Sequence, residues 1–406
     1  MIDIVFGSVL LIVLIIALTA IVIGARTVLM PARPAAVTIN GGMQLATETG
    51  GKLLQVLTDN DILVPSACAG AGTCGLCRVA VTGGGGDPLP TEASRLSRAD
   101  MREGVRLACQ VIVRGDMAVR VADELIGAER FECTVVSVKP LTPLIREIVL
   151  QLPEDRRPDL FAGAFMQLTA PPFSLDYASI SIPDTHTDEW APLRQLTVQS
   201  DEPVTRAYSI SNRIQDTEAG RLVFNIRLAL PPPSVPEAQP GIVSSWLFSL
   251  KEGMMVEASG PFGTFRAQDT DREIVFIGGG VGMAPLRAMI YEQLERLGSK
   301  RKISFWYGAR SRADFFYADE LNALAEKHDN FDLTVALSSP AADDRWEGAT
   351  GFIHTVAYER YLRDHPAPEQ CEYYLCGPPL MIRAVFAMLD DLGVEREDIY
   401  NDDFGL

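Results

Sequence analysis

The chain has 406 residues, of which 47% are hydrophobic and 22% are charged. This is the composition of a globular protein and excludes an extended disordered or collagen-like chain. The 36 Lys and Arg against 53 Asp and Glu give a formal net charge of −17, which argues against nucleic-acid binding because no cationic field is available to displace phosphate counterions. At about 150 residues per domain, the length predicts two to three domains.

Residues 4–24 contain no charged side chain and are almost entirely apolar. As a helix, a segment of this length reaches about 30 Å, enough to cross the hydrocarbon core of a bilayer. A cleaved signal peptide is the alternative, but Asp3 rather than a basic residue precedes the run, and no small-residue cleavage site directly follows it. Arg26 and Arg33 follow the run, so the positive-inside rule predicts a single-pass protein with a periplasmic N-terminus and cytoplasmic domains.

Three cysteines, Cys68, Cys74 and Cys77, are spaced C-x5-C-x2-C on a glycine-rich segment, and Cys109 follows later in RLACQ. Small residues let backbone amides turn toward the sulfur atoms, and a distant fourth cysteine closes the cage. The spacing is close to the plant-type pattern of [2Fe–2S] proteins, with one residue more in the first gap.

A zinc site held by the same cysteines is the alternative to an iron–sulfur cluster. Zinc ribbons usually have two C-x2-C pairs, whereas only Cys74 and Cys77 are so spaced here. We therefore favour the cluster and expect the segment 36–128 to be a ferredoxin-like domain. Cys133 and Cys371 lie in no such context and are interpreted as ordinary buried thiols.

From about residue 130 the pattern changes to short β-branched runs punctuated by turn residues, which indicates an antiparallel barrel over 130–268. Within it, the tetrapeptide Arg206-Ala-Tyr208-Ser209 places Arg206 and Tyr208 on one face of a strand and Ser209 on the other, or on a bulge. A guanidinium beside an aromatic plane suits a pyrophosphate next to a flat ring. Alone, the tetrapeptide is most often an ordinary strand.

Two glycine motifs follow this strand. Gly241 precedes Ser244 and Ser245 where a helix is expected to begin, and a helix N-terminus offers amides and hydroxyls to a phosphate. Gly260 and Gly263 belong to GPFG, which we expect to be the turn that ends the barrel.

In 270–406 an apolar strand predicted at 273–277 runs into a glycine-rich turn and a helix, the pattern of a parallel α/β sheet. The turn lets a pyrophosphate approach the helix N-terminus, and a proline suits a first helical turn. A purely structural turn between strand and helix is the alternative. The candidate residues are Gly278, Gly280, Gly282 and Pro285.

Two further strands end in loops, and in open parallel sheets ligands bind beyond the carboxyl ends of the strands. These loops contribute Gly308 and Arg310, and Cys376, Gly377 and Pro378. Arg310 and Arg312 could bind the 2′-phosphate of NADPH, or they are solvated loop charges. Between the two nucleotides, we favour NADH.

No general acid or base is needed for hydride transfer, so the four histidines are interpreted as residues without a role in the reaction.

The sequence of R-x-Y-S, G-x-x-S, G-P-F-G, the glycine loop, Y-G-x-R and C-G-P-P resembles the ferredoxin-NADP reductase superfamily. The resemblance implies FAD, with Arg206 and Ser244 near its pyrophosphate, Tyr208 on the isoalloxazine face and Ser209 near the reactive nitrogen. It also implies that Cys376 lies near the nicotinamide ring. NADH gives up two electrons together and a [2Fe–2S] cluster accepts one at a time, so we expect the flavin to lie between them.

The whole chain resembles the F subunits of the bacterial sodium-translocating NADH:quinone reductase, from the apolar N-terminal run to the terminal DDFGL. The resemblance implies an NADH dehydrogenase subunit through which electrons enter an inner-membrane complex that reduces ubiquinone and exports sodium. It implies subunits A to E as partners and Phe404 close to the flavin. Two features depart from the family: the chain ends in Leu406, and Ala69 and Ala71 stand where glycine is usual. Neither change removes a cluster ligand, so we expect them to affect the properties of the cluster and not its presence.

Two other functions stay open. A soluble NADH-dependent reductase that feeds an oxygenase shares all three cofactor domains but lacks the membrane span. A membrane-tethered zinc module with a degenerate reductase domain is the other, and the intact motifs argue against it.

Overall fold

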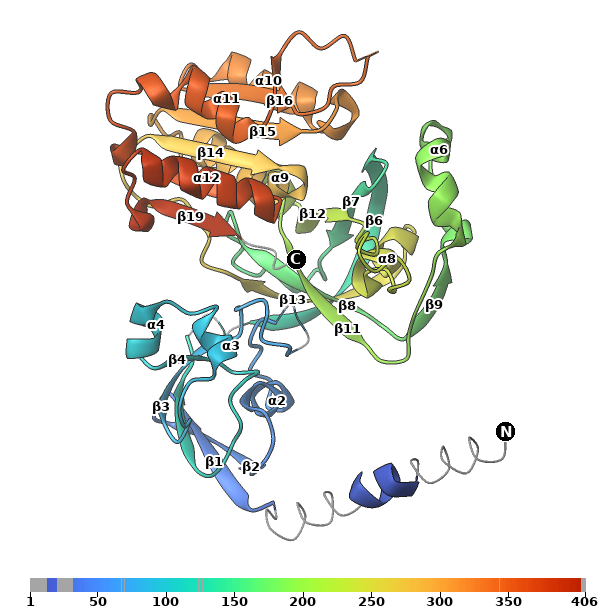
Figure 1. Ribbon diagram of the computed structural model, residues 1–406, viewed down its shortest axis with the longest axis vertical. Coiled ribbons are helices and arrows are strands. Elements are labelled where there is room, and N and C mark those ends of the chain that lie inside the picture. Colours follow the sequence, from blue (N-terminus) through green and yellow to red (C-terminus); the bar gives the residue numbers. More distant parts are fainter. Residues whose placement is uncertain are drawn as a thin grey trace. The chain divides into compact units, whose positions relative to one another are not determined.

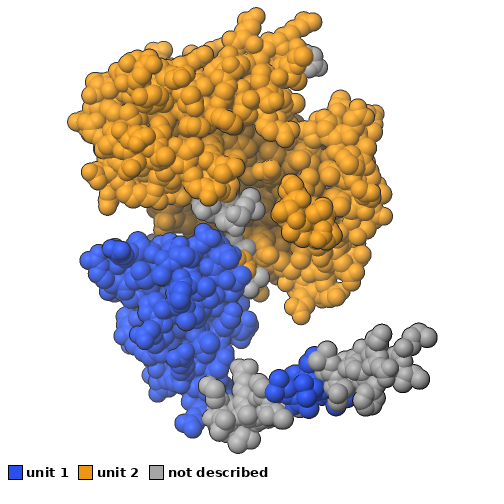
Figure 2. All heavy atoms as spheres, viewed as in Figure 1, with its two compact units in different colours: residues 1–64, 70–126 blue, residues 65–69, 127–406 orange. Residues whose placement is uncertain are grey.

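The computed structural model describes residues 13–19, 32–66, 68, 70–122, 125, 128–342 and 344–402. These residues form two compact units, one from residues 1–64 and 70–126 and the other from 65–69 and 127–406 (Figure 2). Residues 13–19 are helical with exposed side chains. In the part of the chain that is described, no helix is both long and apolar enough to span a bilayer. The rest of the predicted membrane segment 4–24 lies outside the described residues.

The first unit is built on a mixed sheet of strand order β2-β1-β5-β3-β4, with β1 and β5 parallel and the other pairs antiparallel. Along β1, Ala35, Val37 and Ile39 are buried, as the period of two predicts for a strand with one face on the core. Helix α2 covers that face with Leu53 and Leu57. The elements are β1 (Pro34–Ile39), β2 (Met43–Glu48), α2 (Leu53–Asp59), β3 (Arg78–Gly83), α3 (Pro90–Ala93), α4 (Arg98–Arg102), β4 (Val105–Leu107) and β5 (Met117–Arg120).

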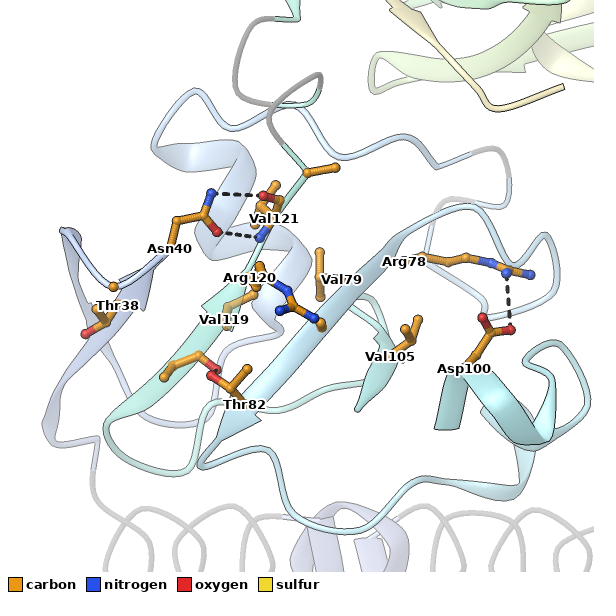
Figure 3. Close-up of a pocket in the computed structure, with 14 residues that line it drawn as sticks. Thr38, Asn40, Arg78, Val79, Thr82, Asp100, Val105, Val119, Arg120 and Val121 are labelled. Atoms are coloured by element: carbon orange, nitrogen blue, oxygen red, sulfur yellow. Dashed lines mark hydrogen bonds and ion pairs between the residues drawn. The ribbon is translucent and has the colours of Figure 1, made fainter. Parts of the chain in front are cut away.

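The opposite face of this sheet carries a hollow of about 710 Å³ (Figure 3). Small side chains such as Ala80 and Ala118 form its floor, and at one side Arg78 Nη1 lies 3.4 Å from Asp100 Oδ2. Among the described residues, no cysteine lines this hollow, and Cys77 and Cys109 belong to the core on the helix-covered face.

The second unit begins with an antiparallel sheet of order β11-β8-β13-β6-β7-β12, which confirms the predicted antiparallel architecture. Its core includes Phe224 and Ile148 from the sheet and Trp246 from α8. The elements are β6 (Glu129–Thr142), β7 (Ile145–Gln151), β8 (Phe165–Ala170), β9 (Phe173–Asp176), α6 (Thr187–Trp190), β10 (Thr197–Ser200), β11 (Val204–Ser209), α7 (Ile214–Glu218), β12 (Arg221–Arg227), α8 (Ile242–Ser249) and β13 (Met255–Phe262).

The expected turn at GPFG differs from the structure, because β13 continues through Gly260 to Phe262. The pairing of β13 with β8 shifts between Ser259 and Phe262. Gly260 has φ +137°, a conformation that residues with a Cβ rarely adopt, so the glycine permits an irregular strand here rather than ending it.

The second unit ends in a parallel sheet, as predicted (Figure 1). Its strand order is β17-β16-β15-β14-β18-β19. Helices α9 and α10 cover one face with side chains such as Leu286 and Leu321, and α11 and α12 cover the other with Val356 and Val385. The elements are β14 (Ile274–Gly279), α9 (Met283–Tyr291), β15 (Ile303–Ala309), α10 (Ala318–Lys327), β16 (Phe331–Leu337), β17 (Ala349–Thr350), α11 (Ile353–Arg360), β18 (Glu372–Cys376), α12 (Pro379–Asp391) and β19 (Ile399–Asp402).

Candidate functional site

The cysteine-bearing segment of the first unit is a tight loop that leads into β3. Gly70, Gly72 and Gly75 have φ values of +80°, +79° and +71°, the left-handed conformation that glycine adopts without steric cost. A Cβ at Gly72 would also lie 2.8 Å from the Gln110 side chain. The three glycines are therefore needed for the path of the loop, and Gly72 also leaves room for the Gln110 side chain.

The pairing of β3 with β4 brings two of the predicted ligands together. Arg78 lies opposite Leu107, so Cys77 and Cys109 come from the ends of neighbouring antiparallel strands, and both are buried. The hydrogen bond between the two thiols raises the pKa of Cys77. Burial and the charge of Cys74 raise this pKa further. The same hydrogen bond lowers the pKa of Cys109 to about 6. Of these two thiols, Cys109 is thus the one that more readily becomes a thiolate.

Two residues that no motif singled out hold the loop around these sulfur atoms. Gln110 Nε2 lies 3.4 Å from Cys109 Sγ and donates to the Gly70 carbonyl at 3.2 Å, and Lys52 Nζ donates to the same carbonyl at 3.2 Å. Thiolate donors surrounded by amides on a glycine loop suit an iron–sulfur cluster. Cys68 belongs to residues 65–69, which group with the second unit, and residues 67 and 69 lie outside the described ranges.

The strand β11 carries the three residues predicted to contact a flavin. Its register against β8 is continuous, so Arg206 and Tyr208 share one face and Ser209 lies on the other without a bulge. Burial raises the pKa of Tyr208, which keeps this phenol neutral. Ser209 is buried, and its hydroxyl donates to Asp402 Oδ2 at 2.9 Å. Asp402 is the first residue of the terminal DDFGL, but no sequence pattern pairs it with Ser209, because only the tertiary fold brings the two residues together.

Helix α8 begins after Gly241, as predicted, but its two serine hydroxyls are used within the protein. Ser244 Oγ donates to the Gly241 carbonyl at 3.0 Å and accepts from Ala229 N–H. Ser245 Oγ donates to the same carbonyl at 2.6 Å and shares a 2.7 Å hydrogen bond with Tyr177. What the helix start offers an anion is therefore the backbone N–H groups of its first turn, which have no intrahelical acceptor.

Two barrel glycines lie against Phe165, the first residue of β8. A Cβ at Gly263, where φ is +115°, would lie 3.2 Å from the Phe165 ring, and one at Gly260 would lie 2.9 Å from Met166 Sδ. These glycines therefore serve close packing at the end of the barrel.

The glycine loop of the parallel sheet lies beside both other predicted loops. Gly278 is opposite Tyr307 on β15 and opposite Cys376 on β18. A Cβ at Gly282 would lie 2.0 Å from the Cys376 carbonyl oxygen, whereas one at Gly280 would meet nothing within 4 Å. Gly282 is thus required for packing against β18, and Gly280, with φ +56°, borders open space at the start of α9.

The remaining nucleotide-loop residues follow the same edge. Gly308 pairs with Gly279, and Gly377 and Pro378 connect β18 to α12. Pro285 lies in the first turn of α9. Arg310 has an 85% exposed side chain 3.8 Å from Asp314, whereas Arg312 is hydrogen-bonded to Asp344.

Asp402 joins the barrel to the nucleotide-loop edge of the parallel sheet. On β19 it lies opposite Cys376, which in turn lies opposite Gly278, and its carboxylate accepts from Ser209 of β11. The fold therefore brings the predicted residues Ser209, Cys376 and Gly278 to one place. Phe404, predicted to lie nearby, is outside the described residues.

A buried arginine that was not among the residues predicted from the sequence makes a second junction. Arg287 of α9 has a 2% exposed side chain, donates to the Ser211 carbonyl just after β11, and forms a double contact with Glu320 at 2.5 and 2.8 Å. Its guanidinium also lies over the Tyr317 ring. Arg287 thus ties the helix that follows the glycine loop to the flavin strand.

Comparison with known proteins relates three stretches of the chain to known domain families. Sequence models of three domain families match: a 2Fe-2S iron-sulfur cluster binding domain over residues 37–114, an oxidoreductase FAD-binding domain over 193–267 and an oxidoreductase NAD-binding domain over 276–386. Among solved structures, a ferredoxin reductase in carbazole 1,9a-dioxygenase is 26% identical, with a TM-score of 0.59 over 92% of this chain and 99% of its own. Amycolatopsis cytochrome P450 reductase GcoB, 24% identical, shares the fold with a TM-score of 0.63 over 91% of this chain and 98% of its own.

The fold and these matches define an oxidoreductase with a [2Fe–2S] domain, an FAD-binding domain and an NAD-binding domain. Relatives that match over their full length identify the family within this class of oxidoreductases. The chain is 47% identical to the F subunit of the Na(+)-translocating NADH-quinone reductase of Neisseria meningitidis over 99% of this chain and all of the relative, and 48% identical to that of Marinomonas sp. over 99% of each. The chain belongs to the family of these F subunits.

Proposed function

We propose that this chain is the NADH-oxidising subunit through which electrons enter a sodium-translocating NADH:quinone reductase. The observation that carries the proposal is the junction at Asp402, where the flavin strand and the nucleotide edge meet through Ser209 and Cys376. When bound, FAD accepts two electrons as a hydride from NADH and releases them one at a time to a [2Fe–2S] cluster.

In this proposal the barrel holds the flavin and the parallel sheet holds the nicotinamide nucleotide. Arg206 and the first turn of α8 receive the flavin pyrophosphate, Tyr208 stacks on the ring, and Ser209 contacts the reactive edge. The open space at Gly280 admits the pyrophosphate of NADH, while Gly308, Gly377 and Pro378 shape the rest of the edge. Asp402 fixes the Ser209 hydroxyl, and Cys376 flanks the nicotinamide; Phe404 remains a prediction here.

The ligands of the cluster are proposed to be Cys68, Cys74, Cys77 and Cys109. The hydrogen bonds from Gln110 and Lys52 to the loop support this assignment, because donors near the sulfur atoms stabilise the thiolate form and tune the cluster.

For NADH rather than NADPH, the support is electrostatic. Arg310 is almost fully exposed beside Asp314, and Arg312 is held by Asp344, so each arginine at this edge has an acidic partner that would repel a 2′-phosphate.

The membrane attachment is proposed from the sequence. Residues 4–24 form the single anchor, residues 36–128 the ferredoxin domain, 130–268 the flavin domain and 270–406 the NADH domain. The exposed apolar side chains of the helical residues 13–19 support the anchor. The protein then sits in the bacterial inner membrane with a periplasmic N-terminus and cytoplasmic cofactor domains, and passes electrons to the other subunits, A to E, that reduce quinone and export sodium.

The test uses the full-length chain in detergent with its cofactors loaded. Stopped-flow absorption after mixing with NADH is expected to show flavin reduction, and frozen samples an electron paramagnetic resonance signal of a reduced [2Fe–2S] cluster. NADPH is expected to react at least tenfold more slowly. In Cys109→Ala, NADH still bleaches the flavin, but the cluster signal is lost. A flavin that NADH leaves oxidised, or equal rates with both nucleotides, would overturn the corresponding part of the proposal.

A further inference from the structure

A cluster of potential metal ligands lies at the edge of the parallel sheet opposite the nucleotide loops. Glu273 immediately precedes β14 and Cys371 immediately precedes β18, and these neighbouring parallel strands begin side by side, with Ile274 opposite Glu372. His365 reaches the same point from the segment after α11. The amino ends of the strands thus gather a carboxylate, a thiol and an imidazole, at the other end of the strands from Gly278 and Cys376.

The three donor atoms face one another at distances that suit a shared ion. His365 Nε2 lies 3.2 Å from Glu273 Oε2 and 3.9 Å from Cys371 Sγ, and donor atoms of the three residues all lie within 4.8 Å of one another. Metal–nitrogen and metal–oxygen bonds of about 2.0 Å and a metal–sulfur bond of about 2.3 Å in a tetrahedral zinc site require donor separations of this order.

The surroundings orient the carboxylate toward the other two donors. Tyr361 donates its hydroxyl to Glu273 Oε1, and Lys302 Nζ lies 3.7 Å from the same oxygen, so Oε2 is the one that faces His365. Partners behind a ligand that fix its orientation are usual in metal sites. The guanidinium of Arg272 points elsewhere, to Asp398 and to the carbonyls of Gln370 and Cys371.

The site has a route to solvent. Glu273, His365 and Cys371 all line a hollow of about 480 Å³, together with Glu369, whose carboxylate adds negative charge, and with Arg272 and Asp398, whose opposite charges are paired with each other. Cys371 itself is only 1% exposed, and the side chains of His365 and Glu273 are 10% and 15% exposed. A hydrated cation therefore has an opening, and water has room for a fourth coordination position.

From this geometry we infer that Glu273, His365 and Cys371 form a zinc-binding site separate from the electron-transfer centres. Thiolate with imidazole and carboxylate favours zinc over magnesium or calcium. On binding, the Cys371 thiol proton passes to solvent and the His365 ring proton resides on Nδ1. The Ala367 N–H then loses its 3.2 Å hydrogen bond to Nδ1, and because Ala367 lines the hollow, water can accept it instead.

The experiment measures zinc on the full-length chain with flavin and cluster loaded. The protein is equilibrated with zinc ions, passed through a desalting column, and analysed for zinc per flavin and for zinc X-ray absorption. We expect one retained zinc per chain with a single sulfur among otherwise nitrogen and oxygen ligands. Cys371→Ser, His365→Asn and Glu273→Gln are each expected to lower zinc affinity at least tenfold.

The matched control is Cys133→Ser, which removes a buried thiol of the barrel and is expected to retain zinc as the unchanged chain does. Flavin absorption verifies that each variant is folded. If Cys371→Ser loses its flavin, the inference is tested by the other two variants and by the zinc X-ray absorption spectrum of the unchanged chain. Absence of retained zinc, retention that none of the three substitutions lowers, or an all-sulfur shell, which would indicate the ferredoxin cysteines, overturns the inference.

Discussion

At the scale of single residues, Gly282 is fixed by packing against the neighbouring strand. A side chain there would place Cβ 2.0 Å from the Cys376 carbonyl oxygen, so Gly282→Ala must displace either α9 or β18. We expect a loss of about 2–3 kcal/mol of unfolding free energy, as for overpacked cores, and a raised KM for NADH. The measurements are thermal unfolding and steady-state kinetics with NADH.

The control for this substitution is Gly298→Ala. Gly298 also has a left-handed backbone, φ +59°, but a Cβ there meets nothing within 4 Å. It is expected to lose about 1 kcal/mol through backbone strain and to keep the KM for NADH. Equal effects of the two substitutions would show that the Cys376 carbonyl is not the constraint.

A second residue-scale prediction concerns the hydrogen bond from Ser209 to Asp402. Ser209→Ala removes a donor to a half-buried carboxylate, an interaction of about 1.5–3 kcal/mol. If this bond positions the reacting groups, hydride transfer to the flavin slows about ten- to hundredfold while flavin binding persists. Stopped-flow flavin reduction measures the effect. Thr205→Val on the same strand, whose hydroxyl pairs with Thr169, should leave the rate unchanged; a slowing there would point to a general disturbance of β11.

At the scale of elements, one buried ion pair holds α3, β4 and the preceding glycine-rich loop together. Arg106 contacts Glu92 at 2.7 Å and donates to the carbonyls of Gly85, Gly86 and Asp87. Burial acts to raise the pKa of Glu92, but hydrogen bonds from Arg106 and from two backbone N–H groups outweigh it and lower the pKa below its ordinary value of 4.5. The carboxylate therefore stabilises the folded unit when it is ionised.

The corresponding prediction is a pH-dependent loss of stability in Glu92→Gln. At pH 7 the variant leaves Arg106 buried without its partner, which costs about 3–5 kcal/mol. Because the folded pKa is below the unfolded one, the wild-type advantage is complete above about pH 4.5 and shrinks as the pH falls through the folded pKa. Urea unfolding followed by cluster absorbance, repeated stepwise toward acid pH, measures it. Glu48→Gln, an exposed carboxylate on β2, should shift stability by no more than about 0.5 kcal/mol; a wild-type advantage that grows in acid contradicts the assignment.

At the scale of the whole molecule, Arg287 couples the flavin barrel to the nucleotide sheet. Arg287→Met removes its contacts to Ser211 and Glu320, and we expect both a stability loss of about 3–5 kcal/mol and at least tenfold slower hydride transfer. Arg301→Met is the matched control. Arg301 forms a similarly buried pair with Glu372 at 2.6 Å, and its other contacts are to the carbonyls of Arg272 and Gln268 in the segment just before β14 rather than to β11.

Arg301→Met should lose a similar free energy of unfolding, measured by urea unfolding. Its rate of hydride transfer, measured by stopped flow, should be unchanged. If both substitutions slow the transfer equally, the rate reflects stability rather than the placement of the two parts that Arg287 joins.

Local patterns predicted the antiparallel and the parallel part of the second unit and the turn between β14 and α9. Alternating and β-branched runs predicted strands such as β7 and β8, and the glycine turn predicted the β14–α9 junction. These signals are local because strand periodicity, left-handed backbone and helix starts each depend on a few neighbouring residues. The last barrel strand ends within GPFG, as expected, but Gly260 belongs to that strand rather than to a turn, because glycine permits both conformations and pairing with β8 decided between them.

By itself the sequence determined the class of protein and the order of its three cofactor domains, since the motifs typical of each domain consist of neighbouring residues. Only the tertiary structure placed Asp402 beside Ser209, Arg287 beside Ser211, and Glu273 beside His365 and Cys371. In each case the partners lie on separate elements, and no local pattern pairs them. Their contact depends on which strands become neighbours, and that is decided by the packing of whole elements rather than by the residues around each partner.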